Sequence, residues 1–153
     1  MTKPTVERKK VAIAADHAGY HLKEKIIGYL RNEKLDLRDF GTDSDESVDY
    51  PDYGHRLADA VASGEYKMGF TICATGNGMN ITVNKHQGIR GALCWSEETS
   101  RLARAHNDAN ICSIPARFVS ESEALLIVKT FLETGFDGGR HARRIEKIPI
   151  KKY

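Results

Sequence analysis

The sequence lacks several features that mark particular classes of protein. No apolar run approaches the roughly 20 residues that a membrane-spanning helix needs, and the start, MTKPTVERKK, lacks the apolar core of a secretory signal. Lysine and arginine together number 23 against 21 aspartates and glutamates, so the net charge alone identifies no partner. The three cysteines, Cys73, Cys94 and Cys112, are odd in number and widely spaced, which does not suit a disulfide framework. We therefore expect a cytoplasmic protein that does not enter a membrane.

Two common phosphate-binding motifs are also missing. In TGNGMN, residues 75–80, Gly76 and Gly78 have the first spacing of a dinucleotide fingerprint, but Ile81 stands where the third glycine belongs. No lysine followed by serine or threonine closes the turn, as a Walker loop requires. What remains is a glycine-rich turn before a helix predicted over residues 77–84. Its backbone N–H groups can hold negative charge, either of a bound phosphate or of a reaction intermediate.

The alternation of apolar patterns predicts an α/β fold. At 153 residues the chain suits a single domain over residues 1–153, with residues 1–8 frayed. Apolar runs predict five strands, at residues 10–16, 35–41, 68–73, 88–95 and 109–115. Helical spacing predicts helices at residues 17–34, 53–63, 77–84, 96–107 and 120–135, and a shorter one within 138–148. We therefore expect a five-stranded parallel sheet with helices on both faces.

Two local signals refine this prediction. Residues 42–53, TDSDESVDYPDY, form a polar stretch with a proline, which is typical of a loop. Ser120 and Glu123 have the spacing of a capping box, which predicts the start of a helix at Ser120.

Polar and reactive residues follow several of the predicted strands. Asp16 and His17 follow the first strand, Cys73 ends the third, and Arg117 follows the fifth. The carboxyl ends of parallel strands meet at one edge of a sheet, and ligands of such folds bind there. We therefore expect these side chains to gather at one edge.

Cys73 allows two interpretations. A thiol beside a helix N-terminus has its thiolate form favoured, which would make Cys73 a reagent. A cysteine in an apolar run is, however, more often a small buried hydrophobic residue. For Cys94 and Cys112, which lie inside predicted strands, we expect burial.

Asp16 and the histidines are also open to more than one interpretation. His17 and His21 are four residues apart and could share a helix face, but no further ligand follows at a metal-site spacing, so we expect no metal. Asp16 suits either proton transfer or capping of the next helix. His106 lies at the end of a predicted helix, where it is either charged by the helix C-terminus or a capping residue.

The C-terminal arginines suggest an anion site. Arg140 and Arg144 in GGRHARR are four residues apart, so on a helix they would share a face and could bind one phosphate. A solvated basic face and a nucleic-acid surface are the alternatives. Acidic residues such as Glu146 and the lack of interleaved aromatics argue against nucleic acid.

Six separated segments together resemble one family. In chain order they are AADHAGYHLKE, DYPDYG, ICATGNGM followed by NK, GIRGALCW, RAHNDAN and GGRHARRIEKI. They resemble the type B ribose-5-phosphate isomerases, which group with the galactose-6-phosphate isomerase subunits. The resemblance implies a Rossmann-like three-layer fold in a homodimer or dimer of dimers with shared active sites. The implied reaction interconverts ribose 5-phosphate and ribulose 5-phosphate through an enediolate, without a metal or other cofactor.

The resemblance also implies roles for individual residues. Cys73 would move a proton between C1 and C2, and Thr75 would handle protons on the substrate oxygens. Asp16 and His106 would open the sugar ring, and Asn107 would contact the sugar.

The remaining implied residues bind the intermediate or the phosphate. The enediolate would be held by the backbone of Ala74, Gly76, Asn77 and Gly78, beside a site wall formed by Tyr50. The phosphate would be held by His17, Arg117, Arg140 and Arg144. The second chain would supply His106, Asn107, Arg140 and Arg144, with the C-terminal segment 137–153 reaching across the interface.

Two positions depart from the family pattern. Ala74 stands where the family commonly has glycine, and the added methyl group fits only if that residue has a negative φ. Met79 stands where one branch has a glutamate base, which leaves Cys73 as the base. The mixed loop leaves open an isomerase of a six-carbon sugar phosphate, such as allose or galactose 6-phosphate. A non-catalytic phosphosugar-binding domain that retains the pocket is the other alternative, although Cys73, Thr75 and His106 together favour catalysis.

Overall fold

The computed structural model describes residues 7–151, so most of the segment expected to be frayed lies outside the described residues. A parallel sheet of five strands forms the centre, in the spatial order β2-β1-β3-β5-β4. The strands are β1 (Lys9–Ala15), β2 (Leu35–Asp39), β3 (Met68–Cys73), β4 (Gly91–Leu93) and β5 (Ile111–Pro115). The helices are α1 (Tyr20–Leu30), α2 (Tyr50–Ala62), α3 (Asn77–Val83), α4 (Glu97–Asn107), α5 (Glu121–Glu133) and α6 (Arg140–Ile145).

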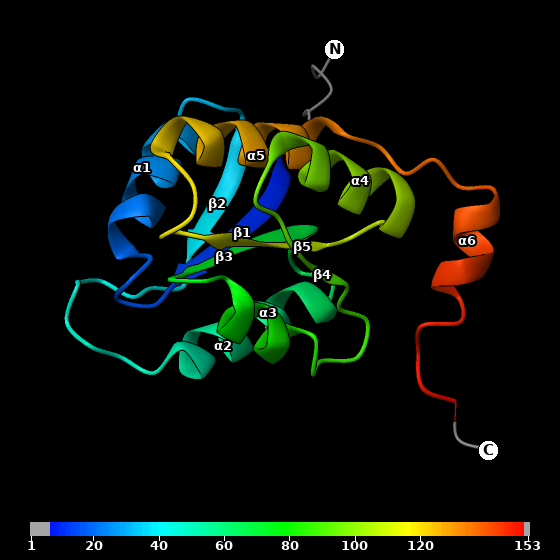
Figure 1. Ribbon diagram of the computed structural model, residues 1–153, viewed down its shortest axis with the longest axis horizontal. Coiled ribbons are helices and arrows are strands. Elements are labelled where there is room, and N and C mark those ends of the chain that lie inside the picture. The colour runs from blue at the N-terminus through cyan, green and yellow to red at the C-terminus, as the bar shows by residue number, and fades with distance from the viewer. Residues whose placement is uncertain (1–6, 152–153) are drawn as a thin grey trace, which may run out of the picture.

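The helices form one layer on each face of the sheet. Figure 1 shows α1, α4 and α5 above the sheet and α2 and α3 below it, while α6 stands at one end. The predicted α/β fold with three layers and a five-stranded parallel sheet is therefore confirmed. None of the helices within residues 7–151 has both the length and the apolar character needed to cross a bilayer.

Alternating side chains of the central strands form two hydrophobic cores. In β1, Val11 and Ile13 pack with the α1, α4 and α5 layer, whereas Ala12 and Ala14 pack with the α2 and α3 layer. Every residue of β3 is buried, as expected for a central parallel strand covered on both faces. The end of β3 is thereby held rigidly between the two layers.

Some predicted boundaries were wrong. Helix α2 begins at Tyr50 and not at residue 53, because Pro51 occupies the first turn, where the missing N–H of proline costs no hydrogen bond. Strand β4 is limited to Gly91–Leu93, since it is an edge strand that pairs only with β5, and the backbone N–H of Arg90 before it donates to the Asn110 side chain (2.8 Å).

The predicted capping box was correct. The Glu123 N–H donates to Ser120 Oγ (3.1 Å), and the Ser120 N–H donates to Glu123 Oε2 (2.9 Å). The helix α5 therefore starts where the sequence pattern indicated.

Candidate active site

The turn between β3 and α3 holds Cys73 at the carboxyl edge of the sheet. Gly76 is the N-cap residue of α3 and has a φ of 74°, a conformation that L side chains rarely adopt. A Cβ atom at Gly76 would also collide with the Leu93 side chain. This turn therefore needs glycine for both its conformation and its close packing.

Backbone hydrogen bonds join the ends of three strands at this edge. The Asp16 N–H donates to the Ile72 carbonyl (3.2 Å), which connects the end of β1 to β3. The N–H groups of Ala116 and Arg117 donate to the carbonyls of Cys73 (2.9 Å) and Ala74 (3.0 Å), which connects β3 to the segment after β5. The predicted gathering of these residues at one edge is confirmed.

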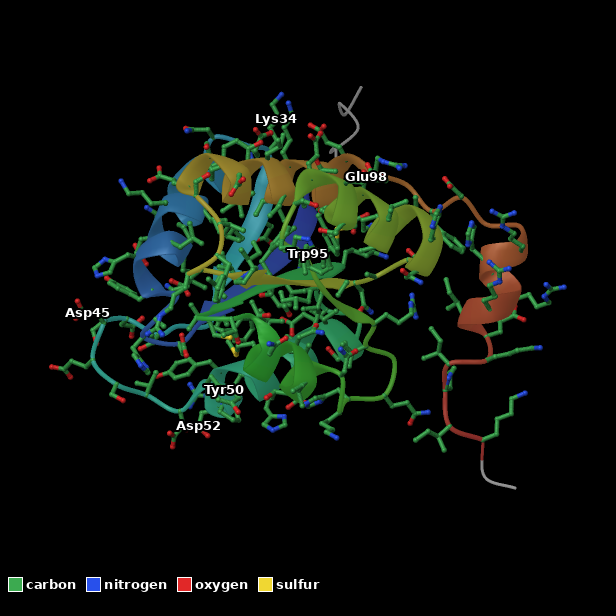
Figure 2. All side chains as sticks on the ribbon, in the orientation of Figure 1. Lys34, Asp45, Tyr50, Asp52, Trp95 and Glu98 are labelled. Carbon is green, nitrogen blue, oxygen red and sulfur yellow. The ribbon has the colours of Figure 1, made fainter. Side chains whose placement is uncertain are left out.

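Tyr50 and Thr75 lie at the same turn. Tyr50 begins α2 (Figure 2), and its ring occupies the space that a side chain at Gly78 would need, with Cζ 2.8 Å from an ideal Cβ position there. Thr75 is exposed, and its Oγ1 accepts a hydrogen bond from the Asn77 N–H (3.2 Å). The turn thus presents a hydroxyl group beside Cys73, with an aromatic ring against its other end.

Asp16 and His17 have defined partners in this structure. The buried Asp16 carboxylate accepts a hydrogen bond from the N–H of Gly19, the N-cap residue of α1, at 3.1 Å. His17 Nδ1 accepts from the Val48 N–H (3.2 Å), whereas His21 Nε2 lies 3.3 Å from Asp45 Oδ2. Because α1 begins at Tyr20, His17 precedes the helix and the two rings do not share a helix face, so they form no metal pair.

The loop residues that depart from the family pattern fit their surroundings. Among non-glycine residues within 7–151, Asp108 alone has a positive φ, so Ala74 has a backbone that accommodates its methyl group. Met79 is fully buried in the core between α2, α3 and the sheet, in the same cluster as Cys73. Met79 is therefore a packing residue.

The three cysteines differ in their surroundings. Cys94 and Cys112 are fully buried, as predicted. The pKa of the Cys112 thiol is raised well above its usual value, mainly by burial and secondarily by the neighbouring Cys94 thiol. Cys73 is also buried, with 4% of its surface exposed, but it lies at the end of its strand where the turn begins. Of the three, Cys73 alone adjoins a glycine-rich turn.

The other predicted site residues lie at the opposite edge of the sheet. His106 and Asn107 end α4, which runs back across the sheet, and Arg90, just before β4, donates through Nε to the Asn107 carbonyl (3.0 Å). Arg140 and Arg144 belong to α6, which packs against the end of α4 and lies far from the start of α1 (Figure 1). These four residues therefore sit beside the amino ends of the strands.

The predicted site residues thus form two groups. The carboxyl-edge group consists of Asp16, His17, Tyr50, Cys73, Ala74, Thr75, Gly76, Asn77, Gly78 and Arg117. The amino-edge group consists of His106, Asn107, Arg140 and Arg144. Within one chain the structure does not bring the two groups together.

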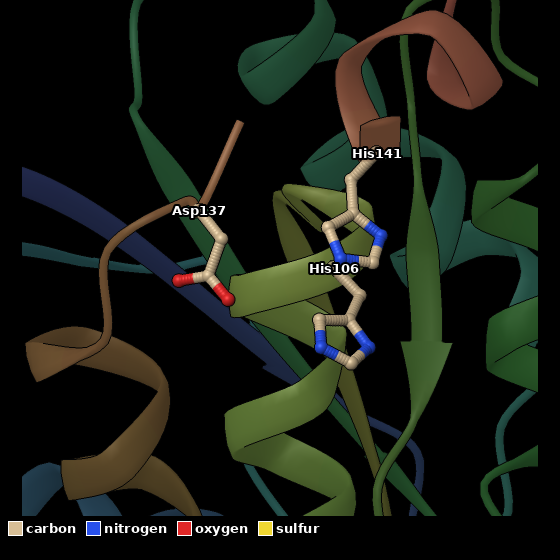
Figure 3. Close-up of side chains that lie close together, drawn as sticks. All are labelled: His106, Asp137 and His141. Atoms are coloured by element: carbon tan, nitrogen blue, oxygen red, sulfur yellow. The ribbon is translucent and has the colours of Figure 1, made fainter. Parts of the chain in front are cut away.

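His106 has two close neighbours that the sequence analysis missed. The His106 and His141 rings are stacked, with centroids 4.2 Å apart and planes 10° from parallel. The side-chain ligand atoms of His106, Asp137 and His141 lie within 4.8 Å of one another (Figure 3). The one signal in the sequence was the histidine directly after Arg140 in GGRHARR.

This cluster is poorly arranged for a metal ion. The lone pair of an imidazole nitrogen lies in the ring plane, so two stacked parallel rings hold their lone pairs in separate planes and do not aim them at one point. Arg140 and Arg144 also place positive charge beside His141, which opposes the binding of a cation there.

A large charged cleft also lies away from Cys73. It has a volume of about 910 Å³ and is lined near the amino ends of β1 and β3 by residues that include Lys10, Lys67, Arg90 and Arg104. The carboxyl-edge group contributes nothing to this cleft.

Together these features define a class of protein. A thiol at the end of a central parallel strand, a glycine turn after it and a buried carboxylate on the neighbouring strand form a site suited to acid–base chemistry on a small anionic molecule. The chain belongs to the Ribose/Galactose Isomerase family, whose sequence profile matches residues 11–148.

Individual relatives are similar over nearly the whole chain. Ribose-5-phosphate isomerase B of Escherichia coli (strain K12) is 41% identical over 140 residues, which cover 92% of this chain and 94% of the relative. A relative from Rickettsia conorii, described more broadly as a sugar phosphate isomerase, is 42% identical over 138 residues, covering 90% of this chain and 96% of its own.

Solved structures have the same fold. A ribose 5-phosphate isomerase from Thermotoga maritima superposes with a TM-score of 0.90 at 49% identity, covering 93% of this chain and 98% of that one. Ribose-5-phosphate isomerase B from Mycoplasma genitalium, solved with bound ribulose-5-phosphate, has a TM-score of 0.88 at 41% identity, covering 91% and 93% of the two chains.

Proposed function

We propose that the protein is an aldose–ketose isomerase that interconverts ribose 5-phosphate and ribulose 5-phosphate through an enediolate. The main observation behind this proposal is the position of Cys73 at the end of β3, at the same edge of the sheet as Asp16 and Arg117. It is supported by membership of a family in which the Mycoplasma genitalium protein has been solved with ribulose-5-phosphate. No metal or organic cofactor takes part in the proposed reaction.

Opening of the sugar ring is the first step for ribose 5-phosphate. The bond between C1 and the ring oxygen breaks, the C1 hydroxyl loses its proton, and the ring oxygen gains one. We assign these two proton transfers to Asp16 and His106, with Asn107 contacting the sugar. General acid–base catalysis of this kind contributes about 10²–10⁴-fold to a rate.

The second step moves a proton between C2 and C1. The Cys73 thiolate takes the C2 proton, the charge moves to the substrate oxygen, and the same group returns a proton to C1. Carbon acids next to carbonyls are weak, so the enediolate needs preorganised donors, which the backbone from Ala74 to Gly78 would supply. Thr75 exchanges protons with the substrate oxygens, and the Tyr50 side chain forms one wall of the site.

The phosphate is bound away from the reacting carbons. His17 and Arg117 come from the carboxyl-edge group, while Arg140 and Arg144 lie on one face of α6. Forked charge-assisted hydrogen bonds from guanidinium groups hold a phosphate in a fixed orientation, which positions C1 and C2 over the thiol.

The two groups of site residues form one site between two chains. In the proposed homodimer, or dimer of dimers, the carboxyl-edge group of one chain faces the amino-edge group of the other. The C-terminal segment from residue 137 onward, part of the same single domain, makes this contact. Exposed apolar side chains after α6 support it, since Ile148 and Ile150 are 57% and 97% exposed in the single chain.

Location in the cytoplasm completes the proposal. Cys73, Cys94 and Cys112 are all free, and a reducing compartment keeps a catalytic thiol in its active form.

The family includes galactose isomerases, so a six-carbon sugar phosphate is the second candidate substrate. Comparing kcat/KM for ribose, allose and galactose phosphates separates the two, because specificity is a ratio of these values. A clearly higher kcat/KM for a six-carbon sugar would replace the first proposal.

Proton exchange tests whether the protein is a catalyst at all. When ribulose 5-phosphate is incubated with the protein in deuterium oxide, we expect deuterium at C1, measured by NMR, and none with Cys73→Ala. A protein that binds ribulose 5-phosphate without exchange would instead be a non-catalytic phosphosugar-binding domain.

A further inference from the structure

His141 and Asp137 surround the side chain to which we assign half of the ring-opening chemistry. We propose that these two residues are positioning residues that hold the His106 ring in the orientation that ring opening requires. The inference rests on the proposed function of His106. It adds two residues that do not themselves touch the sugar.

The contact geometry is the first argument. His141 lies in the first turn of α6 and covers one face of the His106 ring, at 4.2 Å between centroids. Asp137 approaches from the segment between α5 and α6, and its carboxylate lies beside the two rings (Figure 3). The Asp137 N–H donates to the Ala105 carbonyl (2.9 Å), so this residue is tied to the last turn of α4.

The backbone beneath His106 is already fixed by other contacts. Asp108, with a φ of 44°, ends α4, and its carboxylate pairs with Arg104 Nη1 (2.8 Å) and Arg90 Nη2 (3.3 Å). The His106 side chain projects from this rigid turn and is only partly buried, so the backbone alone does not select its rotamer. The stacked His141 ring supplies that missing restraint.

The charges around the pair favour a neutral His141. Partial burial, the neighbouring His106, Arg140 and Arg144 lower the pKa of His141, and Asp137 opposes them. A neutral His141 ring can stack on the His106 ring without repulsion between two imidazolium charges. Glu98 and Arg101, paired at 2.7 Å on α4, also face this region and largely cancel each other.

The consequence is specific to one step. A His106 ring held in one orientation can donate a proton to the ring oxygen of ribose 5-phosphate. Ribulose 5-phosphate has no furanose form, because its O5 carries the phosphate, so removal of its C1 proton needs no ring opening. Loss of a positioning residue should therefore harm isomerisation of ribose 5-phosphate and spare C1 exchange in ribulose 5-phosphate.

The experiment compares these two reactions in three variants. His141→Ala removes the stacked face, and we expect ribose 5-phosphate kcat to fall about 10-fold or more while C1 exchange in ribulose 5-phosphate stays within about twofold. His141→Phe keeps a flat ring and should restore most of the loss. His55→Ala is the control, since His55 pairs with His86 at 2.7 Å elsewhere on the surface and should change neither reaction.

Asp137→Asn tests the carboxylate beside the two rings. We expect kcat for ribose 5-phosphate to fall several-fold, while C1 exchange in ribulose 5-phosphate stays within about twofold. An equal loss in both reactions would mean that the role of Asp137 is purely structural.

Two results would overturn the inference: His141→Ala with wild-type rates in both reactions, or an equal loss in both. Thermal unfolding of each variant checks folding, and His141→Phe keeps the test valid if His141→Ala is unstable. A wild-type protein with no activity in either reaction would instead refute the proposed function itself.

Discussion

The Cys73 sulfur lies at a boundary between two environments. Its strand is buried on both faces, while the residues that follow it form a turn rich in backbone N–H groups. Cys112 shows the alternative, since it lies inside β5 and burial raises the pKa of its thiol. In the sheet Cys112 lies opposite Phe70, three residues or about 10 Å before Cys73. That offset separates a buried packing thiol from a candidate base.

Replacement of Cys73 tests this difference. We expect Cys73→Ala to lower kcat for ribose 5-phosphate by about 10²–10⁴-fold, because the general base is lost, while phosphate-ligand affinity changes little. Steady-state kinetics and calorimetric titration measure the two effects. The matched control is Cys94→Ala, another buried thiol, which should keep its turnover; substantial activity in Cys73→Ala would show that another group is the base.

At the level of single residues, the sequence allowed some predictions and not others. The predicted ends of the strands located Asp16, Cys73 and Arg117, because the position of such residues depends only on the direction of the parallel strands. The stacking of His141 on His106 depends on how the segment after α5 turns back, which two glycines with positive φ, Gly138 and Gly139, determine. No local pattern encodes that path.

The turn before α3 depends on glycine for two separate reasons. Gly76 combines a positive φ with a side-chain collision, whereas Gly64 has a φ of 82° and no atom within 4 Å of an added Cβ. Comparing substitutions at these two glycines therefore distinguishes the cost of backbone strain from the cost of a packing collision.

We expect Gly64→Ala to lower the free energy of unfolding by about 1–2 kcal/mol from strain alone. Gly76→Ala should cost about 1–3 kcal/mol more, because Leu93 must also move. Urea denaturation followed by circular dichroism measures both. Equal losses would mean that the Leu93 contact relaxes without cost.

Helices and strands were predicted well where a local rule decides their ends. Ser120 and Glu123 cap α5 as expected, and β3 has the predicted bounds. The errors arose where partners elsewhere decide the boundary. Strand β4 ends early because it has one neighbour, and α2 starts early because Asp49 and Pro51 begin it within the polar loop.

The whole molecule separates its candidate site residues onto opposite edges of one sheet. The alternation of strands and helices predicted the sheet but not its strand order, since the order depends on long-range packing. The resemblance implied that the late arginines act across an interface, and their place beside the amino ends of the strands fits that arrangement.

Mixing two inactive variants tests the shared site. Cys73→Ala damages the carboxyl-edge group and Arg140→Ala the amino-edge group, so a mixed dimer contains one intact site and one doubly damaged site. Random reassociation of equal amounts should restore about a quarter of wild-type activity, because half the dimers are mixed.

The control is each variant dissociated and reassociated alone, which should recover no activity. A mixture no more active than the average of its components would mean that each site is built within one chain.

The separation of α6 from the turn after β3 within one chain also has a consequence for enzyme activity on dilution. If the site is shared as proposed, a lone chain offers Cys73 no amino-edge group of its own, and the number of working sites follows the number of pairs. Well below the dissociation constant of the pair, that number falls with the square of the chain concentration. Activity per milligram should then fall in proportion to concentration, and turnover would report directly on assembly.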